Sequence, residues 1–315
     1  MTREPSYRAT AFGVMLLVLA GALLVNSGLG TLGLDLVDYP ISQTMLNQLI
    51  GLEIVSVALV APLSAAAGVL ALRGHPAAPV LAFGPAAYTA YMFLQYVLGP
   101  EYGRYAPVVP LQLALFTLGT ALAVWSWTAI DTRRLPRLSR RAERWYGVLL
   151  LALAAFVVSR YLSAIAGFVT SEPIAAEFAD ARTFYWSIVL LDLGVVVPAT
   201  TVAGIALIRG ARPAHTALYA VLGWFALVPP SVASMAATMA AHHDPYGSAG
   251  QAAVLGVVAV LFGGLAVRVY HPLFRRVAPV DGRGAGRSDD TRQRVVGPAP
   301  SGASPLVTDP PECVN

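Results

Sequence analysis

The sequence contains no lysine, so all 21 of its basic residues are arginine. Schiff-base chemistry needs a lysine amine, and its absence excludes retinal proteins and pyridoxal enzymes. Cysteine occurs once, at Cys313, which excludes an intramolecular disulfide and any site built from paired cysteines. The chain also lacks a Gly-rich phosphate loop, an HExxH motif and a spaced histidine set for metal or haem. We therefore expect no cofactor, no metal site and no nucleic-acid partner.

Charge is scarce as well. Only 12% of the 315 residues are charged and 57% are hydrophobic, with a mean hydropathy of +0.64, whereas a soluble domain carries about 25% charged residues. Crossing a bilayer takes roughly 20 apolar residues in a helix. Eight runs of that kind lie near 9–29, 48–72, 78–98, 111–130, 146–168, 186–208, 216–241 and 251–270. The composition predicts an all-α polytopic membrane protein with eight transmembrane helices.

The arginines predict how these helices are oriented. Arginine near the end of a span is retained on the cytoplasmic side. With the N-terminus inside, every arginine except Arg104, Arg160 and Arg182 falls in or beside a cytoplasmic segment. An odd number of helices would scatter the arginines over both faces. We therefore expect both termini to be cytoplasmic, in a plasma (inner) membrane of the bacterial type.

Two stretches of the chain repeat each other. Val60–Gly74 reads VAPLSAAAGVLALRG, and Val196–Gly210 reads VVPATTVAGIALIRG. Gly13–Ala20 and Gly147–Ala154 match at nearly the same offset. Because each copy holds four helices, both copies enter the membrane in the same direction, which predicts a parallel tandem repeat of two four-helix units.

The repeat and the composition together divide the chain. We expect a first four-helix membrane unit over residues 1–130 and a basic cytoplasmic linker over 131–145. A second four-helix unit follows over 146–275. Residues 276–315 are rich in Gly, Pro, Ser, Arg and Asp with few large apolar side chains, which is typical of a disordered cytoplasmic tail.

A few ionisable or polar residues interrupt the apolar runs. Glu53 and Asp192 are the acids, Arg160 is the base, and Asn26 occupies the place in the first unit that Arg160 holds in the second. We interpret these four as repeat-related pairs in one layer near the outer surface. Such residues usually face a bundle interior or a wet cavity. Arg160 and Asp192 could equally form a structural ion pair, and Glu53 could reach the head groups.

Polar residues at helical spacing point to the same layer. Tyr88, Tyr91 and Gln95 share one face of the third span. Ser231, Ser234, Thr238 and His242 share a face of the seventh, although small hydroxyl residues also serve close helix packing. The predicted substrate-binding set is Glu53, Arg160, Asp192, Asn26, Tyr91 and His242. Pro62, Pro198, Pro229 and Pro230 are expected to kink or loosen their helices.

A four-helix unit in which a glutamate, here Glu53, opens the second span resembles small bacterial membrane bundles of the DoxX type, present twice in this chain. The resemblance covers one acid and a hydropathy pattern. The leading hypothesis is a carrier or permease-like protein for a small molecule or cation, with an outward-facing polar site. Two alternatives remain open. One is an intramembrane enzyme acting on a lipid or isoprenoid, for which Glu53, Asp192 and His242 are the candidate acid and base residues. The other is a non-catalytic subunit or assembly factor. Membrane lipid is an expected partner in each case.

Overall fold

The structure is a computed structural model that describes residues 7–171 and 173–274, and within these ranges it contains helices and no strand. The first part holds α1 (Tyr7–Leu29), α2 (Gln43–Val55), the π-helical turn η1 (Ser56–Val60), α3 (Ala61–Leu72), α4 (Ala78–Leu98) and α5 (Val109–Ala129). The second holds α6 (Arg140–Ser159), α7 (Leu162–Thr170), the 3-10 turn η2 (Ala176–Phe178), α8 (Arg182–Leu191), the π-helical turn η3 (Asp192–Val196), α9 (Val197–Arg209), α10 (Ala214–Phe225), α11 (Val228–Ala241) and α12 (Ala249–Phe274).

Seven helices in the described ranges are long and apolar enough to cross a membrane. They are Tyr7–Leu29, Gln43–Leu72, Val109–Ala129, Arg140–Ser159, Arg182–Arg209, Ala214–Ala241 and Ala249–Phe274. The eighth expected span, 78–98, is helical as α4 but is not among them, because its tyrosines, Gln95 and two prolines lower its hydropathy. The composition of the seven indicates a polytopic membrane protein.

Two long helices each contain a π-helical turn. The turn η1 joins α2 to α3 and begins at Ser56, and η3 joins α8 to α9 and begins at Asp192. Pro62 and Pro198 stand in the first turn of the α-helix that follows. A proline has no N–H to donate, and its ring clashes with the carbonyl four residues earlier. The wider turn before each proline relieves both problems, so the expected loosening takes the form of a π-helical turn without a break in the helix.

Close contacts between glycines hold α1 on α3 and α6 on α9. A Cβ on Gly68 would lie 2.9 Å from the carbonyl oxygen of Gly13, and a Cβ on Gly204 would lie 2.9 Å from that of Gly147. Both distances are too short for a real side chain. The two helix pairs are therefore packed backbone to backbone at positions that correspond in the sequence.

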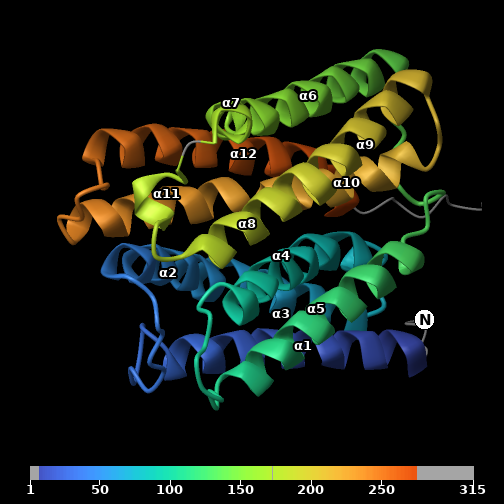
Figure 1. Ribbon diagram of the computed structural model, residues 1–315. Helices are drawn as coiled ribbons and strands as arrows, with labels where there is room; N and C mark the ends of the chain where they lie inside the picture. Colours follow the sequence, from blue (N-terminus) through green and yellow to red (C-terminus); the bar gives the residue numbers. More distant parts are fainter. Residues whose placement is uncertain (1–6, 172, 275–315) are drawn as a thin grey trace, which may run out of the picture. The chain divides into compact units, whose positions relative to one another are not determined.

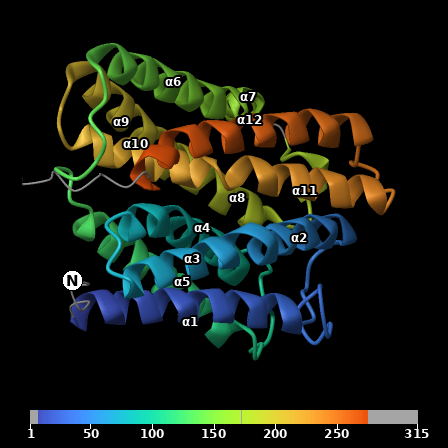
Figure 2. The same ribbon diagram turned by 180° about the vertical axis from the view of Figure 1, so that it is seen from behind.

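The buried apolar side chains form two main clusters. One draws its members from α1–α5, with Leu227 added, and the other from residues 135–270, with Val80 added. Figures 1 and 2 show α1–α5 on one side of the described part and α6–α12 on the other. Between them α4 meets α10 where Gly84 faces Gly223, and α2 meets α11 where Gly51 faces the backbone of Met235.

The structure corrects the expected fifth span. Residues 146–168 do not form one helix: α6 begins six residues earlier, at Arg140, and ends at Ser159, and α7 follows after a turn at Arg160 and Tyr161. Ser139 caps the start of α6 by accepting a hydrogen bond from the Ala142 N–H, so the helix begins inside the segment expected to be a linker. The predicted tail, 276–315, lies outside the described residues.

Candidate functional site

Asp192 is a buried carboxylate held by two tyrosines. The Tyr91 hydroxyl donates to Oδ1 and the Tyr161 hydroxyl donates to Oδ2, each at 2.7 Å. Tyr91 comes from α4, Tyr161 from the turn between α6 and α7, and Asp192 opens the π-helical turn η3. Only 8% of Asp192 is exposed. Both oxygens therefore have a donor, and the site joins α4 of the first part to two elements of the second.

The structure does not form the ion pair considered between Arg160 and Asp192. Arg160 is exposed at the end of α6 and makes no ion pair with any described residue. One residue advances a helix by about 100°, so the neighbouring Tyr161 faces Asp192 and Arg160 faces away. Burial and the charge of Asp244 raise the pKa of Glu177, and the positive charge of Arg160 partly offsets this rise. Arg160 therefore lies near Glu177.

The two π-helical turns begin at different kinds of residue. The turn η1 begins at Ser56 and η3 begins at Asp192, so Asp192 holds the place in its turn that Ser56, and not Glu53, holds in the other. The Tyr88 hydroxyl lies beside Ser56 and shares a 2.7 Å hydrogen bond with Ser231 of α11. Each π-helical turn thus begins beside a tyrosine of α4, but only one of the two places is acidic.

Glu53 lies in a second polar cluster. It is 1% exposed, and its Oε2 accepts a 2.9 Å hydrogen bond from the Thr31 hydroxyl. Its Oε1 is buried with no hydrogen-bond partner among the described residues. A buried polar atom without a partner is unusual in a folded protein. Glu53 does not reach out to the head groups, as one reading of the sequence allowed.

Other buried polar residues share this lack of a partner, and Tyr39 among them lies near Glu53. We call the following set the Glu53 cluster: Asn26 and Ser27 of α1, Tyr39 and Tyr102 of loops, Glu53 of α2 and Gln112 of α5. Within the described residues each has at least one buried side-chain oxygen or nitrogen without a hydrogen bond. Burial, and then the charge of Glu53, raise the pKa of Tyr39, while the Gln112 side chain partly offsets the rise. Tyr39 therefore faces both Glu53 and Gln112.

The polar face of α11 forms helix contacts and does not line an open cavity. Ser231 bonds Tyr88 of α4, and the Thr238 hydroxyl donates to the Asn47 carbonyl of α2 at 2.7 Å. His242 ends this helix with an exposed side chain, away from Asp192 and Glu53. In the described part of the chain no group of three His, Cys, Asp or Glu side chains could hold a metal ion.

Sequence reasoning missed three residues that matter here. Tyr161 is the second donor to Asp192, and its only signal was its place next to Arg160. Asn47 is 2% exposed and donates to Asp244 at 2.9 Å, which ties α2 to the loop after α11. Thr31 lies in a loop and gave no periodic signal at all.

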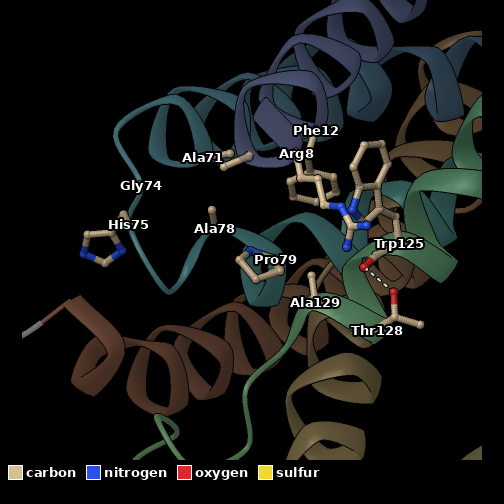
Figure 3. Close-up of a pocket in the computed structure, with 11 residues that line it drawn as sticks. Arg8, Phe12, Ala71, Gly74, His75, Ala78, Pro79, Trp125, Thr128 and Ala129 are labelled. Atoms are coloured by element: carbon tan, nitrogen blue, oxygen red, sulfur yellow. Dashed lines mark hydrogen bonds between the residues drawn. The ribbon is translucent and has the colours of Figure 1, made fainter. Parts of the chain in front are cut away.

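A cavity of about 480 Å³ opens at the other end of α1. Figure 3 shows its lining, which includes Arg8, Phe12, His75 and Trp125, and the hydrogen bond from Thr128 to the Trp125 carbonyl. Among the described residues, none that lines it is a carboxylate. It lies roughly 27 Å from Asn26, counting along α1 at about 1.5 Å per residue, so it is separate from both polar clusters.

No protein-family model matches the chain, and neither a curated protein nor a solved structure matches it. The resemblance of each four-helix unit to DoxX-type bundles therefore gains no support from these comparisons.

Proposed function

We propose that the protein is a polytopic membrane carrier for a small molecule or cation, and that Asp192 takes up and releases its coupling proton. In this proposal α4 is an eighth span, and α1–α5 and α6–α12 are two parallel copies of one four-helix unit. Both chain ends then lie on the cytoplasmic side of a bacterial-type plasma membrane, as the arginine distribution favours.

Three correspondences support the duplication. The turns η1 and η3 begin 136 positions apart, and each is followed by a proline. The Gly13–Gly68 and Gly147–Gly204 contacts join equivalent helices at nearly the same offset. Gly84 and Gly223, which occupy related helices, face each other, as residues beside a pseudo-twofold axis would.

The observation that carries the functional proposal is the Asp192 site. An ionised carboxylate is expensive inside an apolar bundle unless a cation or proton neutralises it, and no described arginine or histidine pairs with Asp192. In the charged state Asp192 accepts charge-assisted bonds from Tyr91 and Tyr161, which are stronger than neutral ones.

Proton uptake would weaken the link between the two units. A protonated Asp192 has lost its charge and has one O–H to donate, so it no longer accepts a charge-assisted hydrogen bond on each oxygen from Tyr91 and Tyr161. Tyr91 belongs to α4, whereas Asp192 sits in η3, where the helix already departs from regular α geometry. A change at this point can alter how α8 packs against α4, which is the kind of movement that alternating access needs.

Cysteine accessibility tests this proposal without knowledge of the substrate. Cys313→Ser removes the single cysteine. Into that background we would place Ser187→Cys or Thr200→Cys, which are buried conservative positions before and after Asp192 on the same long helix. Labelling by a membrane-impermeant maleimide, from each side of oriented vesicles, is then measured as pH is varied.

A carrier predicts that the two cysteines change reactivity with pH in opposite directions. Asp192→Asn should keep the reactivity of both cysteines at the value that the parent shows at one end of the pH range. Asp35→Asn, in an exposed loop, is the matched control and should leave the pH response intact. If neither cysteine is labelled at any pH, or if Asp192→Asn responds as the parent does, Asp192 is a packing residue and the carrier proposal fails.

A further inference from the structure

The Glu53 cluster contains several buried side-chain oxygens that have no hydrogen-bond partner among the described residues. The unpartnered atoms are Asn26 Oδ1, Ser27 Oγ, Tyr39 OH, Glu53 Oε1, Tyr102 OH, and both Oε1 and Nε2 of Gln112. Six of these seven are oxygens. Asn26, Glu53 and Gln112 are each no more than 1% exposed, so bulk solvent cannot satisfy these atoms.

The contacts show that the cluster converges on Glu53. A Cβ on Gly30 would lie 3.1 Å from Glu53 Oε1 and 3.2 Å from the Asn26 carbonyl oxygen, so the end of α1 rests on this carboxylate. Tyr39 packs its ring on Tyr96 of α4 at 6.3 Å and faces both Glu53 and Gln112. Tyr102 also faces Gln112. The end of α1, Thr31 and Tyr39 therefore lie against Glu53, and Gln112 of α5 lies next to Tyr39 and Tyr102.

The chemistry of these atoms favours a hard cation. Carboxylate, amide and hydroxyl oxygens are the ligands such ions take, whereas the softer metals prefer nitrogen and sulfur. Glu53 is the single acid in the cluster. One negative charge neutralises a monovalent ion in an apolar bundle, whereas a divalent ion would leave a positive charge without a partner.

We propose that the Glu53 cluster binds a monovalent metal cation of the sodium class, with Glu53 supplying the charge and Asn26 and Gln112 supplying amide oxygens. The site is distinct from Asp192, and it does not rest on the carrier proposal, because a bound ion could equally brace the fold. It accounts for the buried Oε1 of Glu53, which has no hydrogen-bond partner among the described residues, whereas Oε2 accepts from Thr31.

Thermal unfolding of the purified full-length protein in detergent tests the site. The parent is compared in sodium, potassium and N-methylglucamine chloride at equal ionic strength and fixed pH. An ion that binds only the folded state raises the melting temperature in a saturable way. We expect a saturable rise with sodium or potassium over N-methylglucamine, and we expect Glu53→Gln to abolish it. Asp192→Asn is the control and should keep the cation response.

A second variant tests the site even if Glu53→Gln fails to fold. Gln112→Leu removes one amide oxygen and leaves the charge, so it should raise the half-saturating cation concentration by about tenfold, the equivalent of one modest contact. Equal melting temperatures of the parent in all three salts would overturn the proposal and leave the cluster as a place for water. A cation response that survives in Glu53→Gln would overturn it too, as would a response to calcium alone. If Asp192→Asn lost the cation response and Glu53→Gln kept it, the ion would bind at Asp192 and not at the Glu53 cluster.

Discussion

At the scale of single residues, the two buried acids differ in how far their oxygens are satisfied. Asp192 has a tyrosine donor on each oxygen, whereas Glu53 has one donor and one open oxygen. A buried oxygen without a partner loses its full hydration, so it needs water or an ion. The Asp192 site can therefore respond to protons with the atoms it has, but the Glu53 site needs a further component.

Removing either tyrosine hydroxyl should weaken the fold. Tyr91→Phe or Tyr161→Phe takes one donor from a buried carboxylate, which costs about 1–3 kcal/mol. Tyr105→Phe is the control, because Tyr105 is fully exposed. Unfolding in detergent should show both buried variants less stable than the control. Equal stability of all three would mean that the two hydrogen bonds contribute nothing to the fold.

Asp244 should make stability depend on acid pH. Burial alone would raise its pKa, but hydrogen bonds from the Tyr246 N–H and the Asn47 side chain outweigh burial and lower the pKa below its ordinary value of 3.8. A lowered folded-state pKa stabilises the protein above the unfolded-state pKa, and that contribution disappears as pH falls through the folded value. Melting temperature between pH 6 and about pH 3 should fall less steeply in Asp244→Asn than in the parent. An unchanged slope would contradict the assignment.

At the scale of helices, side chains from one helix complete the ends and turns of another. The guanidinium of Arg140, at the start of α6, donates to the Leu207 and Ile208 carbonyls at the end of α9. The last carbonyls of a helix lack partners within it, and a cation there also meets the negative end of the helix dipole. Arg140 also pairs with Glu143, which bonds His215 of α10. Arg140 and Glu143 together thus join α6 to α9 and α10.

Arg140→Ala should loosen the end of α9. We expect a loss of about 1 kcal/mol in stability, since the bonds are partly exposed. Amide hydrogen exchange near Gly210 should quicken, while exchange in the middle of α9 stays slow. Arg141→Ala is the matched control, because Arg141 is an exposed residue of the same first turn. Faster exchange in both variants would point to net charge as the cause.

At the scale of the whole described part, backbone contact decides how α1–α5 meet α6–α12. A Cβ on Gly84 would come within 2.8 Å of the Gly223 backbone, and a Cβ on Gly51 within 2.5 Å of the Met235 backbone. Neither neighbour is a side chain that could turn aside. Close helix approach through small residues is a common way to associate helices in membranes, where water does not drive their burial.

Gly84→Ala should therefore separate α4 from α10. Overpacking of this kind costs about 1–3 kcal/mol, and Gly256→Ala is its control, because a Cβ there meets nothing within 4 Å. Thermal unfolding in detergent should show Gly84→Ala less stable than the parent and Gly256→Ala unchanged. If the two variants behave alike, α4 and α10 do not touch at these glycines.

The number of spans can be tested directly. If α4 crosses the membrane, the short turn before it and the loop after it lie on opposite sides. His75→Cys and Tyr105→Cys, each in the Cys313→Ser background, should then react with an impermeant maleimide from opposite faces of oriented vesicles. Labelling from the same face would leave seven spans and remove the four-plus-four arrangement.

The sequence by itself determined the class of protein, because composition and run length set whether a helix can lie in lipid. It also identified the stripe of Tyr88, Tyr91 and Gln95 on α4 and the two acids inside apolar runs, since helical spacing and hydropathy are local properties. The positions of Pro62 and Pro198 marked where the long helices would loosen. Each of these follows from residues close together in the chain.

Only the tertiary structure decided which side chains contact one another. Whether Arg160 or Tyr161 faces Asp192 depends on where α6 ends, and one residue turns a side chain by about 100°. Thr31 and Tyr39 meet Glu53, and Gln112 meets Tyr39, from segments that no sequence period connects. Asn47 donates to Asp244, which lies nearly two hundred positions away in the sequence. Hydrophobic spacing tells which face of a helix is buried, but it is non-directional, so only the packed arrangement of helices brings a given donor to a given carboxylate.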